Sequence, residues 1–254
     1  EFEADMQTAK DAGILPMMTY AKDGGTSFVF QALMANNSSA EDVQNWILQK
    51  SGTFDNQAAQ DAASTLQDWN NKGYMPEGVN AVDASTALSR FCNGEGLFFP
   101  SGNWNLDTVA KALGDDVQFF AFPGATSEDE PNVAANAGAF YGIPVNAKNR
   151  DAAAAFLDYT QSAEAQQIIV DNSGYLPKSS TLDLKANSAL QQSMFDAYAD
   201  VLTSGHTSDF INNATAGMQS SGLIPNFQLL LDNSITPQEF TKNVQAQYDK
   251  EAKQ

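Results

Sequence analysis

The chain has 254 residues, 43% of them hydrophobic, a length and composition that allow a sizeable core and exclude a disordered tail. Thirty-one acidic residues against thirteen lysines and arginines give a formal net charge of −18, which argues against nucleic acid and anionic membranes as partners. No apolar stretch approaches the roughly 18 residues of a membrane-spanning helix.

The only cysteine is Cys92, so no internal disulfide is possible. The sequence has no initiator Met and opens, at Glu1, in what reads as the middle of a helix. We therefore expect it to be a fragment of a longer protein, whose signal or lipid anchor lies outside this sequence.

The first elements alternate between helix and extended chain. Apolar residues at helical spacing predict a helix that begins near Phe2 and ends at Gly13. Residues 14–20 are expected to be extended, 22–26 form a loop rich in glycine, and 28–34 form a buried helix.

Three more helices are predicted before residue 93. Ser38 and Glu41 are spaced as a capping box, and Asp55 is expected to cap the next helix. That helix carries an apolar stripe and ends at 72–73, and a short helix is predicted over 85–91.

The most informative stretch runs from a short strand through a turn into a helix. Residues 97–99 suit a buried strand, and 106–113 suit a helix with Asn103 or Asn105 as its cap. Open α/β sheets bind ligands at such strand-to-helix turns. Trp104 between two asparagines offers a flat apolar face beside amide groups, which suits a sugar ring. The alternative is that Trp104 is a core residue and the asparagines are only caps.

The remaining chain is expected to be helical, apart from two strand-like segments and the turns between them. The strands are 117–122 and 138–145, separated by a polar loop over 124–138, and 175–177 is expected to be extended. The helices are one capped by Asp151, one from Ser162 to Gly174, 188–202, 213–231, and one after a capping box at Thr236. Helices alternating with a few strands indicate an α/β or α+β class dominated by helix.

Catalytic and metal-binding patterns are missing from the sequence. His206 is the only histidine, and it lies in a loop-like composition without a nucleophile elbow. One Cys and one His make no zinc site without carboxylates. A glycosidase carboxylate pair could be picked from thirty-one acids at will, so the acids alone carry no information on catalysis. We expect no enzyme activity, no cofactor and no metal.

Five segments, in order, resemble the extracellular solute-binding proteins of bacterial ABC importers, of the sugar-binding kind that includes maltose-binding protein. They are 54–76, with its Gly-Tyr-Met-Pro turn; 91–104, ending in Gly-Asn-Trp; 122–124, Phe-Pro-Gly; 143–157, from Ile-Pro-Val to Phe-Leu; and 174–177, Gly-Tyr-Leu-Pro. Glu95-Gly96 departs from the family, which commonly has Lys-Ala there. The resemblance covers about residues 1–180 strongly and the helical tail weakly.

The resemblance implies an α/β fold of two lobes, of the class II periplasmic-binding-protein type, joined by a hinge. Residues 1–137 would be the main part of the C-terminal lobe, 138–183 the hinge crossing with a segment of the N-terminal lobe, and 184–254 a helical tail returning to the C-terminal lobe. Most of the N-terminal lobe would be missing. The implied function is to bind an extracellular oligosaccharide between the lobes and deliver it to the permease of an ABC transporter.

The implied ligand site is centred on the turn at Trp104. Trp104 would stack on a sugar face, the neighbouring amides would bond its hydroxyls, and aromatic residues of both lobes would complete the wall. The candidate residues are Gly102, Asn103, Trp104, Asn105, Phe140, Tyr141, Tyr20, Asp23 and Tyr175.

Two alternatives and one open question remain. A carbohydrate-active enzyme would also use stacking aromatics, and a binding protein for a peptide, polyamine or other polar solute would share the fold. The question concerns residues 142–182, whose apolar side chains the family buries against the N-terminal lobe. Without that lobe the segment could fold back on the C-terminal lobe, pair with the same segment of another molecule, or have its partners among residues outside this sequence. We expect the intermolecular pairing, so that the isolated fragment forms a dimer. The residues concerned are Ile143, Phe156, Leu157, Ile168 and Ile169.

Overall fold

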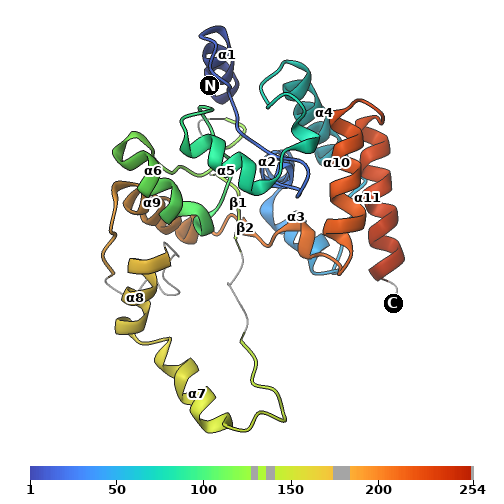
Figure 1. Cartoon of the computed structure of the whole chain (residues 1–254). Helices are drawn as coiled ribbons and strands as arrows, with labels where there is room; N and C mark the ends of the chain where they lie inside the picture. The colour runs from blue at the N-terminus through green and yellow to red at the C-terminus, as the bar shows by residue number, and fades with distance from the viewer. Residues whose placement is uncertain (127–130, 136–140, 174–183, 253–254) are drawn as a thin grey trace. The chain divides into compact units, whose positions relative to one another are not determined.

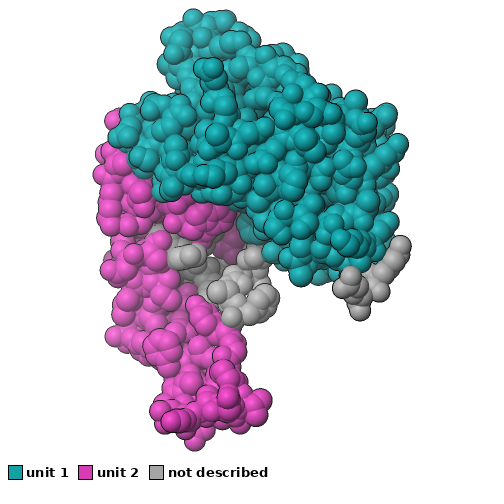
Figure 2. All heavy atoms as spheres, turned by 45° about the vertical axis from the view of Figure 1, so that its right-hand side comes forward, with its two compact units in different colours: residues 1–101, 121–135, 201–254 teal, residues 102–120, 136–200 magenta. Residues whose placement is uncertain are grey.

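The computed structural model describes residues 1–126, 131–135, 141–173 and 184–252 (Figure 1). Most of the regular structure in this part of the chain is helical, and it also contains one pair of short parallel strands. The chain divides into two compact units (Figure 2). Unit 1 comprises 1–101, 121–135 and 201–254, and unit 2 comprises 102–120 and 136–200. No helix in the described ranges is both long and apolar enough to cross a membrane.

Unit 1 contains most of the helices. Its α-helices are α1 (Phe2–Asp11), α2 (Thr26–Asn36), α3 (Ala40–Ile47), α4 (Gln57–Asn71), α5 (Ala84–Cys92), α10 (Ile224–Leu231) and α11 (Pro237–Ala252). Short 3₁₀-helices occur at Val79–Ala81 and Ile211–Asn213, and a π-helix spans Met218–Leu223.

The core of unit 1 is an aromatic cluster between α2, α4, α10 and α11. The Phe30 ring lies 5.3 Å from the rings of Phe227 and Phe240 and 5.6 Å from Phe54, between centroids. All four side chains are buried. The predicted buried helix over 28–34 is confirmed, and it supplies the centre of this core.

Several helix ends are as predicted. Gly13 follows α1 with a φ of +76°, a left-handed conformation that favours glycine. The predicted capping box at the last helix is confirmed, because Thr236 N donates to Glu239 Oε2 at 2.8 Å and Glu239 N donates to Thr236 Oγ1 at 3.2 Å. Ser162 also caps as expected, accepting from Ala165 N.

Three predicted caps are wrong, two of them by one residue. Helix α3 is capped by Ser39, whose Oγ accepts from Asp42 N at 3.1 Å, and not by the box of Ser38 and Glu41. Ser38 instead donates to Met34 O at 3.0 Å, at the end of α2. This bond commits the Ser38 hydroxyl to the preceding helix.

The other two corrections have different causes. Asn56, not Asp55, caps α4, because the Asp55 carboxylate accepts from Thr241 Oγ1 at 2.7 Å and so holds α11. Helix α7 (Arg150–Tyr159) begins one residue before Asp151, at an N-cap, Asn149, that makes no side-chain capping bond.

The predicted strands are mostly wrong. Residues 97–99 form no strand: Leu97 is exposed, and Phe98 makes one parallel bridge to Met17, with Met18 N donating to Phe98 O at 2.8 Å. Residues 117–122 and 141–145 are irregular, and 136–140 lie outside the described residues. A strand needs a run of hydrogen-bonded pairs with a neighbour, and periodicity cannot show how far such a pairing extends.

The strand pair that does form lies where loops were predicted. Strand β1 (Val133–Ala134) falls within the expected polar loop 124–138 and pairs in parallel with β2 (Thr207–Ser208). Val133 N donates to His206 O at 3.0 Å, and Ala135 N donates to Ser208 O at 2.9 Å. Both strands belong to unit 1.

Unit 2 is built from fewer and less buried helices. They are a 3₁₀-turn at Asn103–Asn105, α6 (Leu106–Leu113), a 3₁₀-turn at Gly114–Asp116, α7, α8 (Ala163–Ser173) and α9 (Ala189–Ser204), whose last residues belong to unit 1. The predicted helices over 106–113, 162–174 and 188–202 are confirmed within one or two residues. The expected lobe boundaries at 137 and 183 stay a prediction.

Candidate functional site

The turn at Trp104, in unit 2, exposes a tryptophan. Residues Asn103–Asn105 form a 3₁₀-turn that leads directly into α6. Trp104 is 42% exposed, whereas Trp46 and Trp69 in unit 1 are each 3% exposed. The alternative that Trp104 is a core residue is therefore wrong for the described chain.

Gly102 allows the indole to lie over the backbone of the turn. A Cβ built on Gly102 would collide with the six-membered ring of Trp104, so any other residue would displace that ring. Asn105 occupies the N-cap position of α6, one of the two positions predicted for the cap, but its side chain makes no capping bond. The predicted cap position at Asn105 is therefore confirmed, without the side-chain bond expected there. The turn thus presents a partly exposed indole flanked by two amide side chains.

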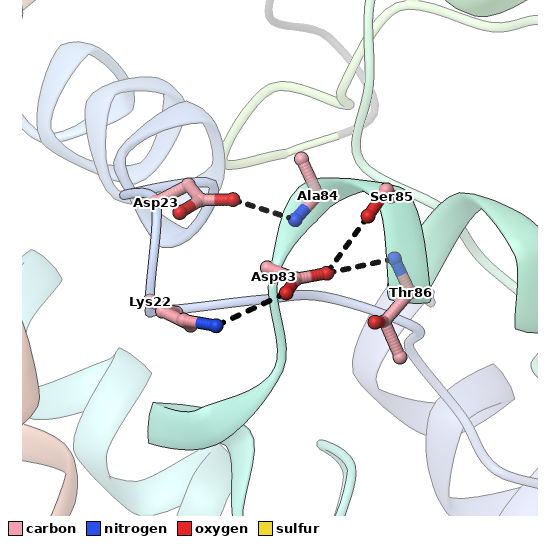
Figure 3. Close-up of polar contacts among 6 residues, drawn as sticks. All are labelled: Lys22, Asp23, Asp83, Ala84, Ser85 and Thr86. Carbon is pink, nitrogen blue, oxygen red and sulfur yellow. Dashed lines mark hydrogen bonds and ion pairs between the residues drawn. The ribbon is translucent and has the colours of Figure 1, made fainter.

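A second turn, residues 20–26 in unit 1, carries the candidates Tyr20 and Asp23, and Figure 3 shows the polar contacts of Asp23 and its neighbour Lys22. Asp23 Oδ2 accepts a hydrogen bond from the backbone N of Ala84, the first residue of α5, at 2.9 Å. Lys22 Nζ forms an ion pair with Asp83 Oδ2 at 3.1 Å. The carboxylate of Asp83 also accepts from Thr86 N at 2.9 Å as the cap of α5. Two acidic residues therefore fasten this turn to the start of α5.

Hydrogen bonds change the acidity of the Asp83 carboxyl group. The bonds from Thr86, then those from Lys22 and Ser85, hold the pKa of Asp83 well below its usual range. The carboxylate therefore stays charged at neutral pH and keeps its bond to Lys22.

Tyr20 packs beneath the same turn. Its ring lies against Gly25, where a Cβ would collide with it, and the side chain is buried. Burial, and then the charge of Asp23, raise the pKa of the Tyr20 hydroxyl, so the group stays protonated at neutral pH. Gln219, on the π-helix, donates from Nε2 to the backbone O of Asp23 at 3.0 Å, so the π-helix also holds this turn.

The structure thus places six of the nine predicted residues in two turns. Gly102, Asn103, Trp104 and Asn105 lie together in unit 2, and Tyr20 and Asp23 lie together in unit 1. Tyr141 is exposed in unit 2, while Phe140 and Tyr175 lie outside the described residues. The prediction missed Lys22, Asp83 and Gln219. Asp83 and Thr86 have cap spacing that could have been found, whereas the partnership of Gln219 with residue 23 is not visible in sequence.

The described chain holds no group of three or more His, Cys, Asp and Glu side chains placed to bind a metal ion.

Comparison with known proteins gives one family and many similar structures. The sequence model of the family described as "Bacterial extracellular solute-binding protein" matches residues 1–195. No curated protein sequence matches the chain significantly.

Solved structures match nearly the whole chain at low identity, and so show its fold alone. A chitin oligosaccharide binding protein is 18% identical with a TM-score of 0.82, over 99% of this chain and 64% of its own. A family 1 extracellular solute-binding protein from Bifidobacterium longum subsp. infantis is 18% identical with a TM-score of 0.70, over 98% of this chain and 65% of its own. The maltose-maltodextrin binding protein of Alicyclobacillus acidocaldarius is 17% identical with a TM-score of 0.67, over 96% and 64%. This chain therefore spans about two thirds of the length of the structures it matches.

Proposed function

Because this chain belongs to the family of bacterial extracellular solute-binding proteins, whose members act outside the cytoplasm, we propose that it binds an extracellular oligosaccharide. It delivers this sugar to the permease subunits of an ABC transporter. The similar structures include a chitin oligosaccharide binding protein, a sugar transporter in complex with stachyose and a maltose-maltodextrin binding protein, which supports a glycan in preference to another polar solute.

The observation that carries the proposal is the exposed indole of Trp104 between two asparagines. An exposed aromatic face stacks on the C–H surface of a pyranose, and flanking amides both donate to and accept from its hydroxyls. The Tyr20 hydroxyl and the Asp23 carboxylate are further hydrogen-bonding groups for the same kind of ligand. The candidates in the undescribed ranges, Phe140 and Tyr175, remain part of the proposed site.

The lobe assignment is part of the proposal. Residues 1–137 and 184–254 supply the C-terminal lobe, and 138–183 cross into the N-terminal lobe. Its support is that the similar structures align over almost all of this chain but over only about two thirds of their own length. The membrane attachment we propose is a lipid anchor outside this sequence.

The test is a thermal-shift screen of the protein against chito-, malto-, xylo- and galacto-oligosaccharides, with spermidine and a neutral tetrapeptide as competing solute classes. A ligand present at about 100 times its Kd adds about 2.7 kcal/mol of stability. We expect one oligosaccharide class to raise the melting temperature. A shift with spermidine or the peptide alone would contradict the carbohydrate assignment.

Substitution of Trp104 locates the site. Trp104→Ala should weaken binding of the best oligosaccharide at least tenfold, which corresponds to about 1.4 kcal/mol. Phe120→Ala is the matched control, since Phe120 is an exposed aromatic residue of the same unit outside the turn. Equal affinities for the two variants would remove Trp104 from the site.

The family and the similar structures are binding proteins, and we further propose that this chain catalyses no reaction. Incubation of the purified protein with the same glycans should yield no hydrolysis product. A product that disappears when one particular carboxylate is substituted would identify a carbohydrate-active enzyme.

A further inference from the structure

Helix α2 buries one long polar side chain in the core of unit 1. Gln31 is 2% exposed, and its neighbours Phe30 and Met34 on the helix are also buried. A buried amide lowers stability unless its donors and its acceptor are paired. The partners of Gln31 therefore identify what this side chain holds in place.

The side-chain amide of Gln31 bonds to one short segment, which begins at the last residue of β2. Its Nε2 donates to Ser208 Oγ at 3.0 Å and to Asp209 O at 2.6 Å, and its Oε1 accepts from Ile211 N at 3.0 Å. From α3, Gln44 Oε1 accepts from Asp209 N at 2.6 Å. Side chains of α2 and α3 thus hold the chain that runs from the end of β2 to the start of the 3₁₀-helix at Ile211–Asn213.

The C-terminal end of α2 holds two other segments in the same way. Asn36 Nδ2 donates to Pro123 O at 2.8 Å, and Asn36 Oδ1 accepts from Asn132 Nδ2 at 3.1 Å. The segment of Asn132 continues into β1, which pairs with β2. Gln31 and Asn36 together therefore fasten three separate stretches of unit 1 to one helix.

These stretches lie close in sequence to the points at which the chain passes between the units. The boundaries fall after residues 101, 120, 135 and 200. We name 121–126, 131–135 and 206–211 the returning segments. Each belongs to unit 1: 121–126 and 206–211 follow stretches of unit 2 in the chain, and 131–135 precedes one.

We propose that Gln31 and Asn36 are positioning residues, which fix the returning segments to α2 and thereby limit the range of positions open to unit 2. Helix α2 suits this role because most of its residues are buried in the core of unit 1. The same helix starts from the turn at 20–26, where Thr26 N donates to Tyr20 O at 3.1 Å. One rigid element thus carries both the returning segments and a turn of the proposed site.

The main test needs no sugar, so it does not depend on the proposed function. Spin labels at Lys50→Cys in unit 1 and Glu164→Cys in unit 2, both exposed positions, are placed in a Cys92→Ser background. Electron–electron double resonance then gives the distribution of distances between the units. We expect Gln31→Met to broaden this distribution at least twofold.

Thr241→Val is the matched control. Thr241 is fully buried in α11 and its Oγ1 donates to Asp55 Oδ1 at 2.7 Å, so this variant also loses buried hydrogen bonding, but away from the returning segments. Urea midpoints measured on both variants establish their stabilities. A distribution as narrow for Gln31→Met as for Thr241→Val overturns the proposal.

A second variant covers the case in which Gln31→Met does not fold. Asn36 is only partly buried, and Asn36→Leu releases the segments at 123 and 132 without opening the core. It should broaden the distribution by a smaller factor, and an unchanged width would overturn the role of Asn36 and of α2 as the anchor.

A second measurement rests on the proposed function. The oligosaccharide that gives the largest thermal shift should bind Gln31→Met about tenfold more weakly and Thr241→Val with unchanged affinity. Equal affinities of the two variants would contradict a positioning role at the site. If no sugar shifts the unsubstituted protein, the proposed function fails and the spin-label result still decides the role of Gln31.

Discussion

In unit 1, the rings of Phe30, Phe54, Phe227 and Phe240 are at most 1% exposed, whereas on α7 of unit 2 Phe156 is 64% exposed. The cluster in unit 1 joins helices from both ends of the chain. Helix α7 contains no buried residue, and Figure 1 shows no other helix of unit 2 lying along it. The two regions use similar apolar residues, and only the first has partners for them within the described chain.

The difference shows what helical spacing can and cannot predict. Apolar residues three and four apart identify the face of a helix that should be buried. The partner for that face comes from tertiary structure, and a large side chain left in water forgoes roughly 1.5–3 kcal/mol. The face of α7 that carries Phe156 and Tyr159 is therefore a surface that favours association.

The largest contrast is expected in the stability of core and surface variants. Phe30→Ala should lower the free energy of unfolding by about 3–5 kcal/mol, because it leaves a cavity in the aromatic cluster. Phe156→Ala should change it by less than about 0.5 kcal/mol. Urea denaturation at a concentration where the chain is monomeric measures both, and a similar loss in the two variants would mean that α7 is packed in solution.

Self-association tests whether a second copy covers α7. We expect the 254-residue chain to sediment as a dimer, and Phe156→Asp to raise its dissociation constant at least tenfold, or about 1.4 kcal/mol, because a charge would be buried in the interface. Lys50→Asp, an exposed change in unit 1, is the control. A stable monomer in which residues 142–173 resist proteolysis would contradict the expected pairing.

The helix caps of the two regions should differ by a smaller amount. Asn56 Oδ1 accepts from Ala59 N at 2.9 Å at the start of α4, whereas Asn149 before α7 makes no side-chain capping bond. Asn56→Ala should therefore cost about 1 kcal/mol, and Asn149→Ala should be close to neutral. Thermal unfolding of the two variants under one condition gives the comparison, and equal losses would argue against it.

The smallest effect concerns pH and unit 1 alone. The pKa of Asp83 is lowered in the folded state, so its contribution to stability is complete above the ordinary carboxyl pKa of about 4 and is lost as the pH falls below it. The stability difference between the unsubstituted protein and Asp83→Ala should be constant near neutral pH and shrink in acid. A difference that grew on acidification would contradict the assigned hydrogen bonds.

Local signals in the sequence predicted much of the helical fold and little of the rest. The caps at Gly13, Ser162 and Thr236 depend on neighbouring residues alone, and they are confirmed. The predicted cap at Asp55 is wrong because its carboxylate accepts a hydrogen bond from Thr241, which lies 186 residues away in sequence. The strand at 97–99 failed because its pairing with residues 15–18 is limited to one bridge, and an apolar run does not reveal how far a pairing extends.

The candidate site shows the same limit. Glycine, tryptophan and two asparagines in one turn are readable from the sequence, and the structure places them together. The exposure of Trp104 is set by what packs around it, as is the bond from Gln219 to the turn at Asp23, which joins residues 196 positions apart. Their assignment to a ligand stays a proposal.

The unequal burial of the three tryptophans gives the protein an optical reporter. Trp46 and Trp69 lie in an apolar interior and Trp104 lies partly in water, so the three indoles should differ in emission wavelength and in access to a soluble quencher. Iodide should quench the red-shifted part of the emission, which comes from Trp104, and leave the blue part. A sugar stacked on that indole would shield it from iodide and shift its emission to the blue, so a titration followed by fluorescence would observe the proposed contact without any label.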